Sequence, residues 1–318
     1  MSNLTPNPSP SVGPFASEEP AVTVPVFRPP VSLEDQTAFF PHAEGTPPPE
    51  PPVHIPHLGH ALLFLAIYGV FFFIQILFVG LTHPTAITSK VSANSISPKL
   101  LVGSQALTYI GALALSWLLF PLLWKRTFAE GLQLNFDAAR RNALRLIPMG
   151  LILSFAVQAI SSLATLPKNI PLDDFFRTTS DVWFVAVFGT LVAPFFEEVA
   201  FRGFLLPAFA ITYDWLSLPR TPGALEAWHS NNKLSTPALV FSSVLTSILF
   251  AAIHGFQTAF AWPVLILLFC VSLVLSYVRI RLRSVMASTF IHVSYNATVF
   301  LIAFTATGGF RHLDKLTH

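Results

Sequence analysis

The stretch VWFVAVFGTLVAPFFEEVAFRGFLLPAFAI, residues 182–211, decides the fold of this chain. It is apolar throughout except for three charged residues, Glu197, Glu198 and Arg202. An apolar run of this length crosses a bilayer as a helix. Charged side chains inside such a helix are costly, usually face the interior of a bundle and mark a functional site. The stretch therefore predicts a membrane protein with a polar site in its core.

The spacing of the three charges separates them into a pair and a single group. Glu198 and Arg202 stand one helical turn apart and can form an ion pair. Glu197 points to a neighbouring face and has no obvious partner. The functional interpretation makes Glu197 a reactive carboxylate, and the alternative is that all three residues form a structural polar cluster.

The composition places the whole chain in the membrane class. Of its 318 residues, 53% are hydrophobic and 11% are charged, whereas soluble domains carry about 25% charged residues. No basic stripe or aromatic platform is present, so the sequence predicts no nucleic-acid partner. The single cysteine, Cys270, excludes a disulfide within the chain and makes a thiol-based metal site unfavourable.

The chain divides into a tail and a bundle. Fifteen of the 27 prolines fall in residues 1–56, which predicts a disordered Pro-rich tail. Residues 57–318 predict an all-α, polytopic membrane helix bundle of seven or eight transmembrane helices. The eighth, a re-entrant or half-length segment, stays open because Pro194 could break the acidic stretch. The seven predicted spans are Ala61–Thr82, Leu100–Leu123, Leu146–Leu166, Val182–Ile211, Pro237–Phe256, Ala259–Val278 and Ser284–Ala306.

Basic residues in the loops predict the orientation of the chain. The segment 124–145 holds five basic residues and the loop 83–99 holds two. The positive-inside rule then places 124–145 and the N-terminus in the cytoplasm, together with a predicted basic loop at 279–283. The Leu and Phe positions of 124–145 suit a short interfacial helix. We expect a multi-pass protein of a bacterial plasma membrane, with the lipid bilayer as its surroundings.

Two more residue pairs bring polar side chains into apolar segments. Phe250 with His254, and His292 with Asn296, each stand four residues apart and so share a helix face. A buried Glu suits a general base, an imidazole can share the proton of a water, and Asn or His can hold an oxyanion. His254 lies toward the end of its predicted span, whereas Glu197 and His292 lie deeper. Convergence of these groups would support hydrolysis.

The sequence leaves the need for a metal open. Neither the HExxH signature of zinc proteases nor the GxSxG elbow of serine hydrolases occurs. A divalent metal such as zinc would need His254, His292 and a carboxylate as ligands.

Three short motifs carry a resemblance to a known family. They are Glu197-Glu198-Val-Ala-Phe-Arg202-Gly, then Phe250-Ala-Ala-Ile-His254, then His292-Val-Ser-Tyr-Asn296. In this order on membrane helices they resemble the motifs of the CPBP intramembrane proteases. That family includes CAAX prenyl endopeptidases of the Ras-converting-enzyme type and bacterial bacteriocin-processing and self-immunity proteins. The resemblance covers 182–306.

The resemblance implies a role for each motif residue. Glu197 and His254 would activate the attacking water, and Glu198 with Arg202 would orient the site. His292 and Asn296 would hold the oxyanion, and Phe250 would be a packing residue. Family members include both metalloproteases and glutamate proteases. In a metalloprotease Glu197, His254 and His292 would be the metal ligands.

Three functions compete. The leading hypothesis is an intramembrane endopeptidase that cleaves a membrane-associated peptide or protein, prenylated or not. The second is a non-proteolytic membrane scaffold or bacteriocin self-immunity protein with the same fold. The third is a transporter whose buried charges line a pathway, which would favour an internal repeat that the sequence does not show.

Overall fold

The computed structural model describes residues 54–84, 96–163, 171–231 and 233–316. Within these ranges all regular structure is helical and no strand is present. Seven helices in the described part of the chain are long and apolar enough to cross a membrane. This confirms the predicted all-α polytopic bundle. The predicted tail, residues 1–56, lies outside the described residues except for 54–56, so its disorder and its boundary stay predictions.

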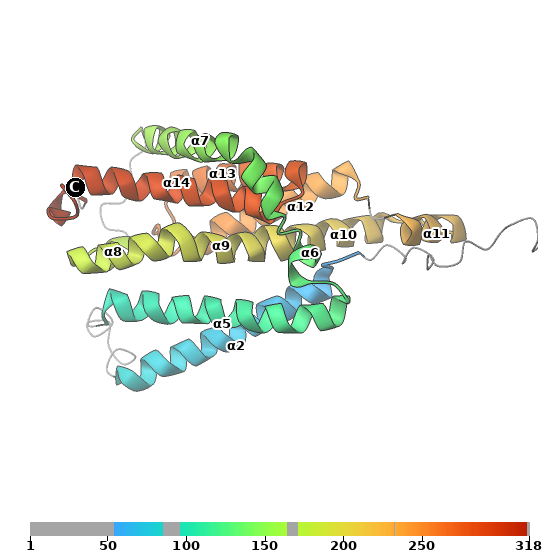
Figure 1. Ribbon diagram of the computed structural model, residues 1–318, viewed down its shortest axis with the longest axis horizontal. Helices are drawn as coiled ribbons and strands as arrows, with labels where there is room; N and C mark the ends of the chain where they lie inside the picture. The colour runs from blue at the N-terminus through green and yellow to red at the C-terminus, as the bar shows by residue number, and fades with distance from the viewer. Residues whose placement is uncertain (1–53, 85–95, 164–170, 232, 317–318) are drawn as a thin grey trace, which may run out of the picture. The chain divides into compact units, whose positions relative to one another are not determined.

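The long helices of the bundle have short helices between some of them (Figure 1). The order along the chain is α2 (Leu58–Thr82), α5 (Pro98–Trp124), α6 (Phe128–Leu132), α7 (Phe136–Ser161), η1 (Pro171–Phe175), α8 (Thr179–Val187), η2 (Phe188–Val192), α9 (Ala193–Glu198), η3 (Val199–Leu205), α10 (Leu206–Ser217), α11 (Pro222–Ser230), α12 (Thr236–Ile253), α13 (Trp262–Leu282), α14 (Val285–Ala306) and η4 (Leu313–Leu316).

The acidic stretch forms one continuous helix at the centre of this arrangement. The segments from α8 to α10 run from Thr179 to Ser217 without a break, which is 39 residues. We call this segment the central helix. α2 and α5 pack together and against one side of the central helix (Figure 1). α12 packs mainly on its α10 segment, and α14 packs on its α9 and η2 segments. α7 packs on α14, and α13 lies against α12 and α14.

Pro194 does not break the central helix. Two π-helical turns, η2 and η3, interrupt the regular α-helical hydrogen bonding without ending the helix, and η2 lies just before Pro194. Such turns insert one residue into a helix and are often found at functional sites. The helix consequently continues past the predicted end at Ile211 to Ser217.

The third span begins earlier than predicted. Asn135 caps α7 by accepting a hydrogen bond from the backbone N–H of Ala138 at 3.0 Å, and Asp137 lies in the first turn. Both features stabilise the start of a helix, so α7 includes the arginines that the sequence assigned to a separate segment. The predicted interfacial helix is reduced to the five residues of α6.

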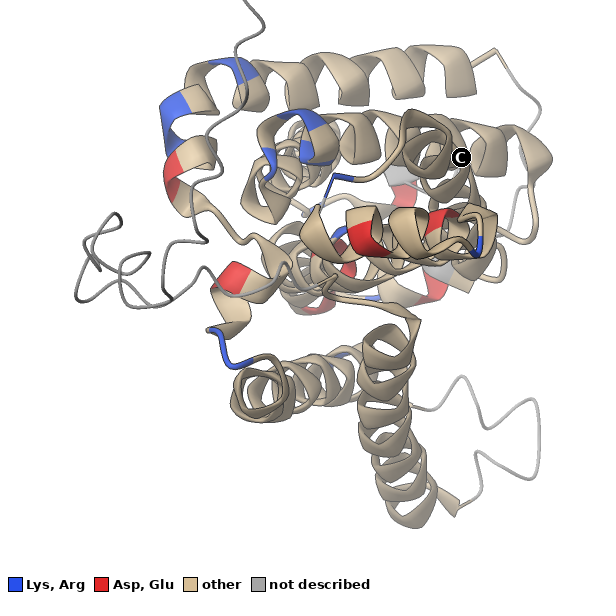
Figure 2. Ribbon diagram, turned by 90° about the vertical axis from the view of Figure 1, so that its right-hand side faces the viewer, with Lys and Arg blue, Asp and Glu red and all other residues tan. Residues whose placement is uncertain are grey.

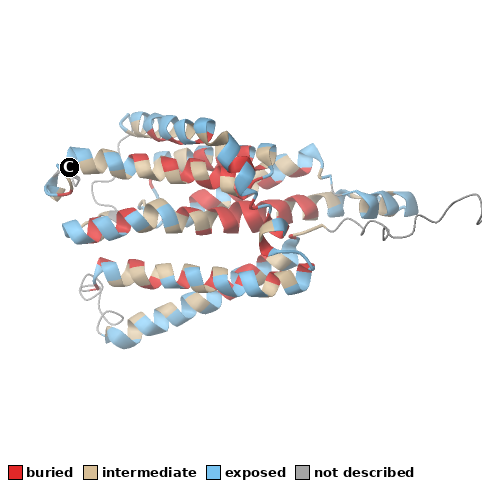
Figure 3. Cartoon of the chain, viewed as in Figure 1, coloured by how far each residue is buried: buried red, intermediate tan, exposed pale blue. Residues whose placement is uncertain are grey.

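Basic residues collect at one end of the bundle. They follow α5, occupy the first turns of α7 and end α13, and Figure 2 shows the blue segments from that side. They are Lys125, Arg126, Arg140, Arg141, Arg145, Arg281 and Arg283. Buried residues, by contrast, concentrate along the middle of the central helix and its neighbours (Figure 3).

Candidate active site

The predicted ion pair lies in the core of the bundle. Nη1 of Arg202 donates to Oε1 of Glu198 at 2.8 Å, and both side chains are fully buried. Nη2 of Arg202 also donates to the carbonyl and the hydroxyl of Ser272 on α13, at 3.0 and 2.7 Å. Arg202 therefore fixes Glu198 within the central helix and fastens that helix to α13.

Glu198 in turn holds His292 of α14. Its Oε1 lies 3.0 Å from Nδ1 of the imidazole. A carboxylate paired with arginine can only accept, so Nδ1 is the donor in this contact. This bond sets the orientation of the buried His292 ring, in the way that a carboxylate orients a catalytic histidine.

Glu197 lies on the other side of the same imidazole. Its Oε2 is 3.7 Å from Nε2 of His292, longer than a direct hydrogen bond. The Glu197 side chain is 15% exposed, whereas that of Glu198 is 0% exposed. The two adjacent glutamates thus differ: Glu198 is closed in by its partners, and Glu197 keeps an accessible carboxylate.

His254 ends α12 as its C-cap residue and is half-buried. Its Nδ1 lies 2.8 Å from the carbonyl oxygen of Phe250. A carbonyl oxygen only accepts, so Nδ1 carries the proton and Nε2 of the neutral ring is left as an acceptor. Among the described residues no hydrogen bond or ion pair joins His254 to Glu197.

The ring of Phe250 brings the three motifs together. It is 1% exposed, and its centroid lies 4.7 Å from that of His254 and 5.9 Å from that of His292. The guanidinium carbon of Arg202 stands 4.9 Å from the same ring, within the range of a cation–π interaction. The resemblance implies a packing role for Phe250, and its ring makes these contacts to all three motifs.

Asn296 lies one turn beyond His292 on α14 and reaches the first π-helical turn. Its Nδ2 donates to the carbonyl oxygen of Gly189 at 2.7 Å. The amide nitrogen has two hydrogens, so this contact leaves one donor.

The side chains do not form a metal site as they lie. In the described ranges no group of three or more His, Cys, Asp or Glu side chains could hold a metal ion. Of the set proposed from sequence, His292 directs Nδ1 to Glu198, and His254 directs Nδ1 to a backbone carbonyl.

Sequence reasoning missed two residues of this network. Ser272 binds Arg202, as described above. Arg279, predicted to lie in a cytoplasmic loop, is instead a residue of α13 that is 6% exposed and donates to the carbonyl of Arg202. The Arg-x-Arg-x-Arg pattern gave no sign that its first arginine is buried, because that depends on the helix opposite.

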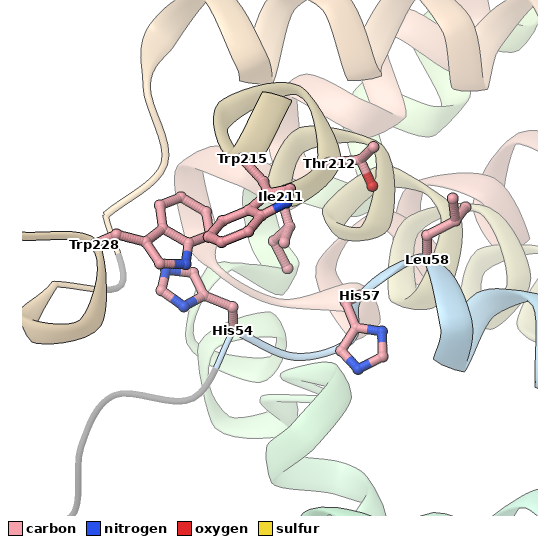
Figure 4. A pocket seen from close by; sticks show the side chains of 7 residues that line it. All are labelled: His54, His57, Leu58, Ile211, Thr212, Trp215 and Trp228. Atoms are coloured by element: carbon pink, nitrogen blue, oxygen red, sulfur yellow. The ribbon is translucent and has the colours of Figure 1, made fainter. Parts of the chain in front are cut away.

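A separate apolar pocket of about 270 Å³ lies where the chain enters α2 and leaves α10 (Figure 4). His54 stacks on Trp228 with ring centroids 3.9 Å apart, and Trp215 lies beside Trp228. Burial lowers the pKa of His54 and of His57. None of the predicted site residues lines this pocket.

Comparison with known proteins supports the resemblance seen in the motifs. Residues 179–298 match the family described as Type II CAAX prenyl endopeptidase Rce1-like. The match starts at the central helix and contains all six predicted site residues. It is consistent with the CPBP family and supports a protease of the CAAX type. The comparisons with curated proteins and with solved structures gave no match.

Proposed function

We propose that the protein is an intramembrane endopeptidase that hydrolyses a peptide bond with a water activated by Glu197 and His254. The observation that carries the proposal is the position of His292, held by Glu198 on one side and facing Glu197 on the other, inside the segment that matches the CAAX endopeptidase family. Carboxylate and imidazole groups beside one another are the usual groups for general acid–base hydrolysis.

The reaction we propose starts with removal of a proton from water. Glu197 is the accessible carboxylate, and Nε2 of His254 is an acceptor, so either group can take this proton. The oxygen of the water then bonds to the carbonyl carbon of the substrate, and the π electrons of the C=O bond move to the carbonyl oxygen, which becomes the oxyanion. When the tetrahedral intermediate collapses, the C–N bond breaks and the stored proton passes to the leaving amine.

The remaining motif residues hold the geometry for this step. Glu198 and Arg202 keep the His292 ring in place with Nε2 toward the space beside Glu197, and because Nδ1 donates to Glu198, Nε2 donates to an oxyanion only from the protonated ring. The second hydrogen of the Asn296 amide is available to an oxyanion, because the first is used by Gly189. Donors fixed in advance around the developing charge supply a large part of the rate in acyl transfer.

The substrate we propose is a membrane-associated peptide or protein, prenylated or not. The bundle would lie in a bacterial plasma membrane with its N-terminus and its basic end in the cytoplasm, as the positive-inside rule predicts. The competing scaffold, self-immunity and transport functions make no use of Glu197 as a base.

Cleavage of quenched membrane peptides by purified protein tests the proposal. The panel contains prenylated and unprenylated peptides, and the variants are Glu197→Gln, His254→Ala and the control Glu226→Gln, an exposed glutamate on α11. We expect Glu197→Gln to lose at least about a hundredfold in kcat, the scale of a general base, with Glu226→Gln unchanged. Equal activity in Glu197→Gln and the native protein would refute the mechanism.

Chelation separates the two protease types in the same assay. Unchanged cleavage after exhaustive treatment with a chelator supports the glutamate mechanism proposed here. Loss of cleavage in chelator and recovery with Zn²⁺ would replace it with a metal mechanism.

A further inference from the structure

Both π-helical turns of the central helix are followed by a proline at a matching position. Pro194 comes five residues after Gly189 of η2, and Pro207 comes five residues after Arg202 of η3. In a π-helical turn each carbonyl accepts from the N–H five residues later. Proline has no N–H. Each turn should therefore leave one backbone carbonyl without a donor from its own helix.

The hydrogen bonds of η2 show this pattern. The N–H of Ala193 donates to the carbonyl of Phe188, five residues before it. The next carbonyl, that of Gly189, would need the missing N–H of Pro194. Instead, Nδ2 of Asn296 on α14 donates a hydrogen bond to this carbonyl at 2.7 Å.

The hydrogen bonds of η3 repeat this pattern later along the same helix. The N–H of Leu206 donates to the carbonyl of Phe201, again five residues before it. The carbonyl of Arg202 would come next and would need an N–H from Pro207. Nε of Arg279 supplies the donor from α13 at 3.3 Å.

Arg279 also donates to a second backbone carbonyl that lacks a partner within its own helix. Its Nη1 donates to the side-chain oxygen of Gln133 at 2.9 Å, and its Nη2 donates to the carbonyl of Leu132 at 3.3 Å. Leu132 is the last residue of α6, where helix carbonyls lack partners within the helix. One buried guanidinium thus joins the end of α6, α13 and the π-helical turn that carries Arg202.

We infer that Arg279 is a positioning residue of the proposed protease: it replaces the backbone donor that Pro207 withholds from Arg202 and so keeps η3 in register for the site. The inference rests on the proposed function. The contacts run in one line, from Arg279 to the carbonyl of Arg202, from the Arg202 side chain to Glu198, and from Glu198 to His292. A shift of η3 would turn the His292 ring away from Glu197.

The geometry of Arg279 is specific to a guanidinium. Its donors sit on three nitrogens in one plane and serve three acceptors on two segments, η3 and the end of α6, whereas the donors of an ammonium group all leave from a single nitrogen. Arg281 stands two residues later on the same helix, is exposed, and provides a matched control.

The decisive experiment combines Arg279→Gln with Pro207→Ala, which restores an N–H at the position that faces the carbonyl of Arg202. kcat and KM for a cleaved peptide are measured for the native protein, both single variants, the double variant and Arg281→Gln. We expect Arg279→Gln to lower kcat by about ten- to a hundredfold, the usual loss when a residue that orients a reactive side chain is removed, with KM nearly unchanged. The double variant should recover at least half of this loss on a logarithmic scale, and Arg281→Gln should match the native protein.

Two results would overturn the inference. One is a double variant as slow as Arg279→Gln or slower, since the new N–H would then replace nothing. The other is an unchanged kcat in folded Arg279→Gln, which would make the residue merely structural.

Thermal unfolding of the same set needs no substrate and separates this inference from the proposed function. If the native protein cleaves no peptide, the protease proposal fails, and the role of Arg279 is judged by its coupling to Pro207. Recovery of at least half of the lost Tm in the double variant would support the replaced donor. Additive losses of Tm would refute it.

Discussion

The helix α2 and the central helix differ in hydropathy and in burial, and the more hydrophobic of the two is the less buried. The most apolar 18-residue stretch of α2 has a mean hydropathy of 2.6, and 11% of its residues are buried. The corresponding stretch of the central helix has a mean hydropathy of 1.7, and 50% of its residues are buried. In a membrane the lipid is as apolar as the side chains, so hydropathy does not draw a helix into the interior. The less hydrophobic helix is inside because it carries the groups that need partners.

The two helices also differ in what holds them. α2 buries three apolar residues along one edge, Ala61, Phe64 and Ile67, and the Phe64 ring stacks on Phe204 with centroids 4.4 Å apart. The central helix is held by a charged and hydrogen-bonded network around Arg202. The buried face of α2 is apolar and its Gln75 makes neutral hydrogen bonds to α5, whereas the central helix adds a buried ion pair to its apolar packing.

The largest expected effect comes from removing one charge of the central network. Arg202→Met leaves Glu198 buried without its ion-pair partner, which should cost about 3–5 kcal/mol of unfolding free energy. Unfolding in detergent measures it. The double variant Arg202→Met with Glu198→Gln should regain most of the loss, because it removes both charges. A single variant as stable as the native protein would mean that packing alone suffices to hold the central helix.

A smaller effect tests the packed edge of α2. Phe64→Ala removes a fully buried ring and should cost about 3 kcal/mol, near the lower end for such a truncation. Phe73→Ala, on the same helix with a ring that is 60% exposed, should change stability by less than about 0.5 kcal/mol. The comparison is made by thermal unfolding of both variants in the same detergent. Equal losses would contradict the exposed position of Phe73.

The smallest expected effect compares one glycine in each helix. A Cβ at Gly69 of α2 meets nothing within 4 Å, so Gly69→Ala should stabilise the helix by about 0.5 kcal/mol. A Cβ at Gly189 of η2 would stand 3.1 Å from the Phe300 ring, and Gly189→Ala should lose about 1 kcal/mol through crowding. The order of the two Tm values checks the prediction, and the reverse order would show that α14 yields easily at Phe300.

Sequence reasoning reached the parts that depend on local pattern. The seven membrane helices in number, the Glu198–Arg202 pair one turn apart and the meeting of the three motifs in the core agree with the structure, although several span ends differ. It failed where a local signal was overruled. Pro194 suggested a break, but the π-helical turn before it keeps the helix continuous. Arg279 was counted with the cytoplasmic basic residues, but it is buried in α13.

The residue types and their spacing by themselves determine a polytopic helical membrane protein with a buried acidic site, because the period of a helix and the cost of a charge in lipid are local properties. Only the tertiary structure decides that His292 lies between two glutamates and that Asn296 and Arg279 serve the carbonyls left free by Pro194 and Pro207. Those contacts join residues 77 to 107 positions apart. Which helix faces which carbonyl depends on how the helices pack, and no local pattern carries that information.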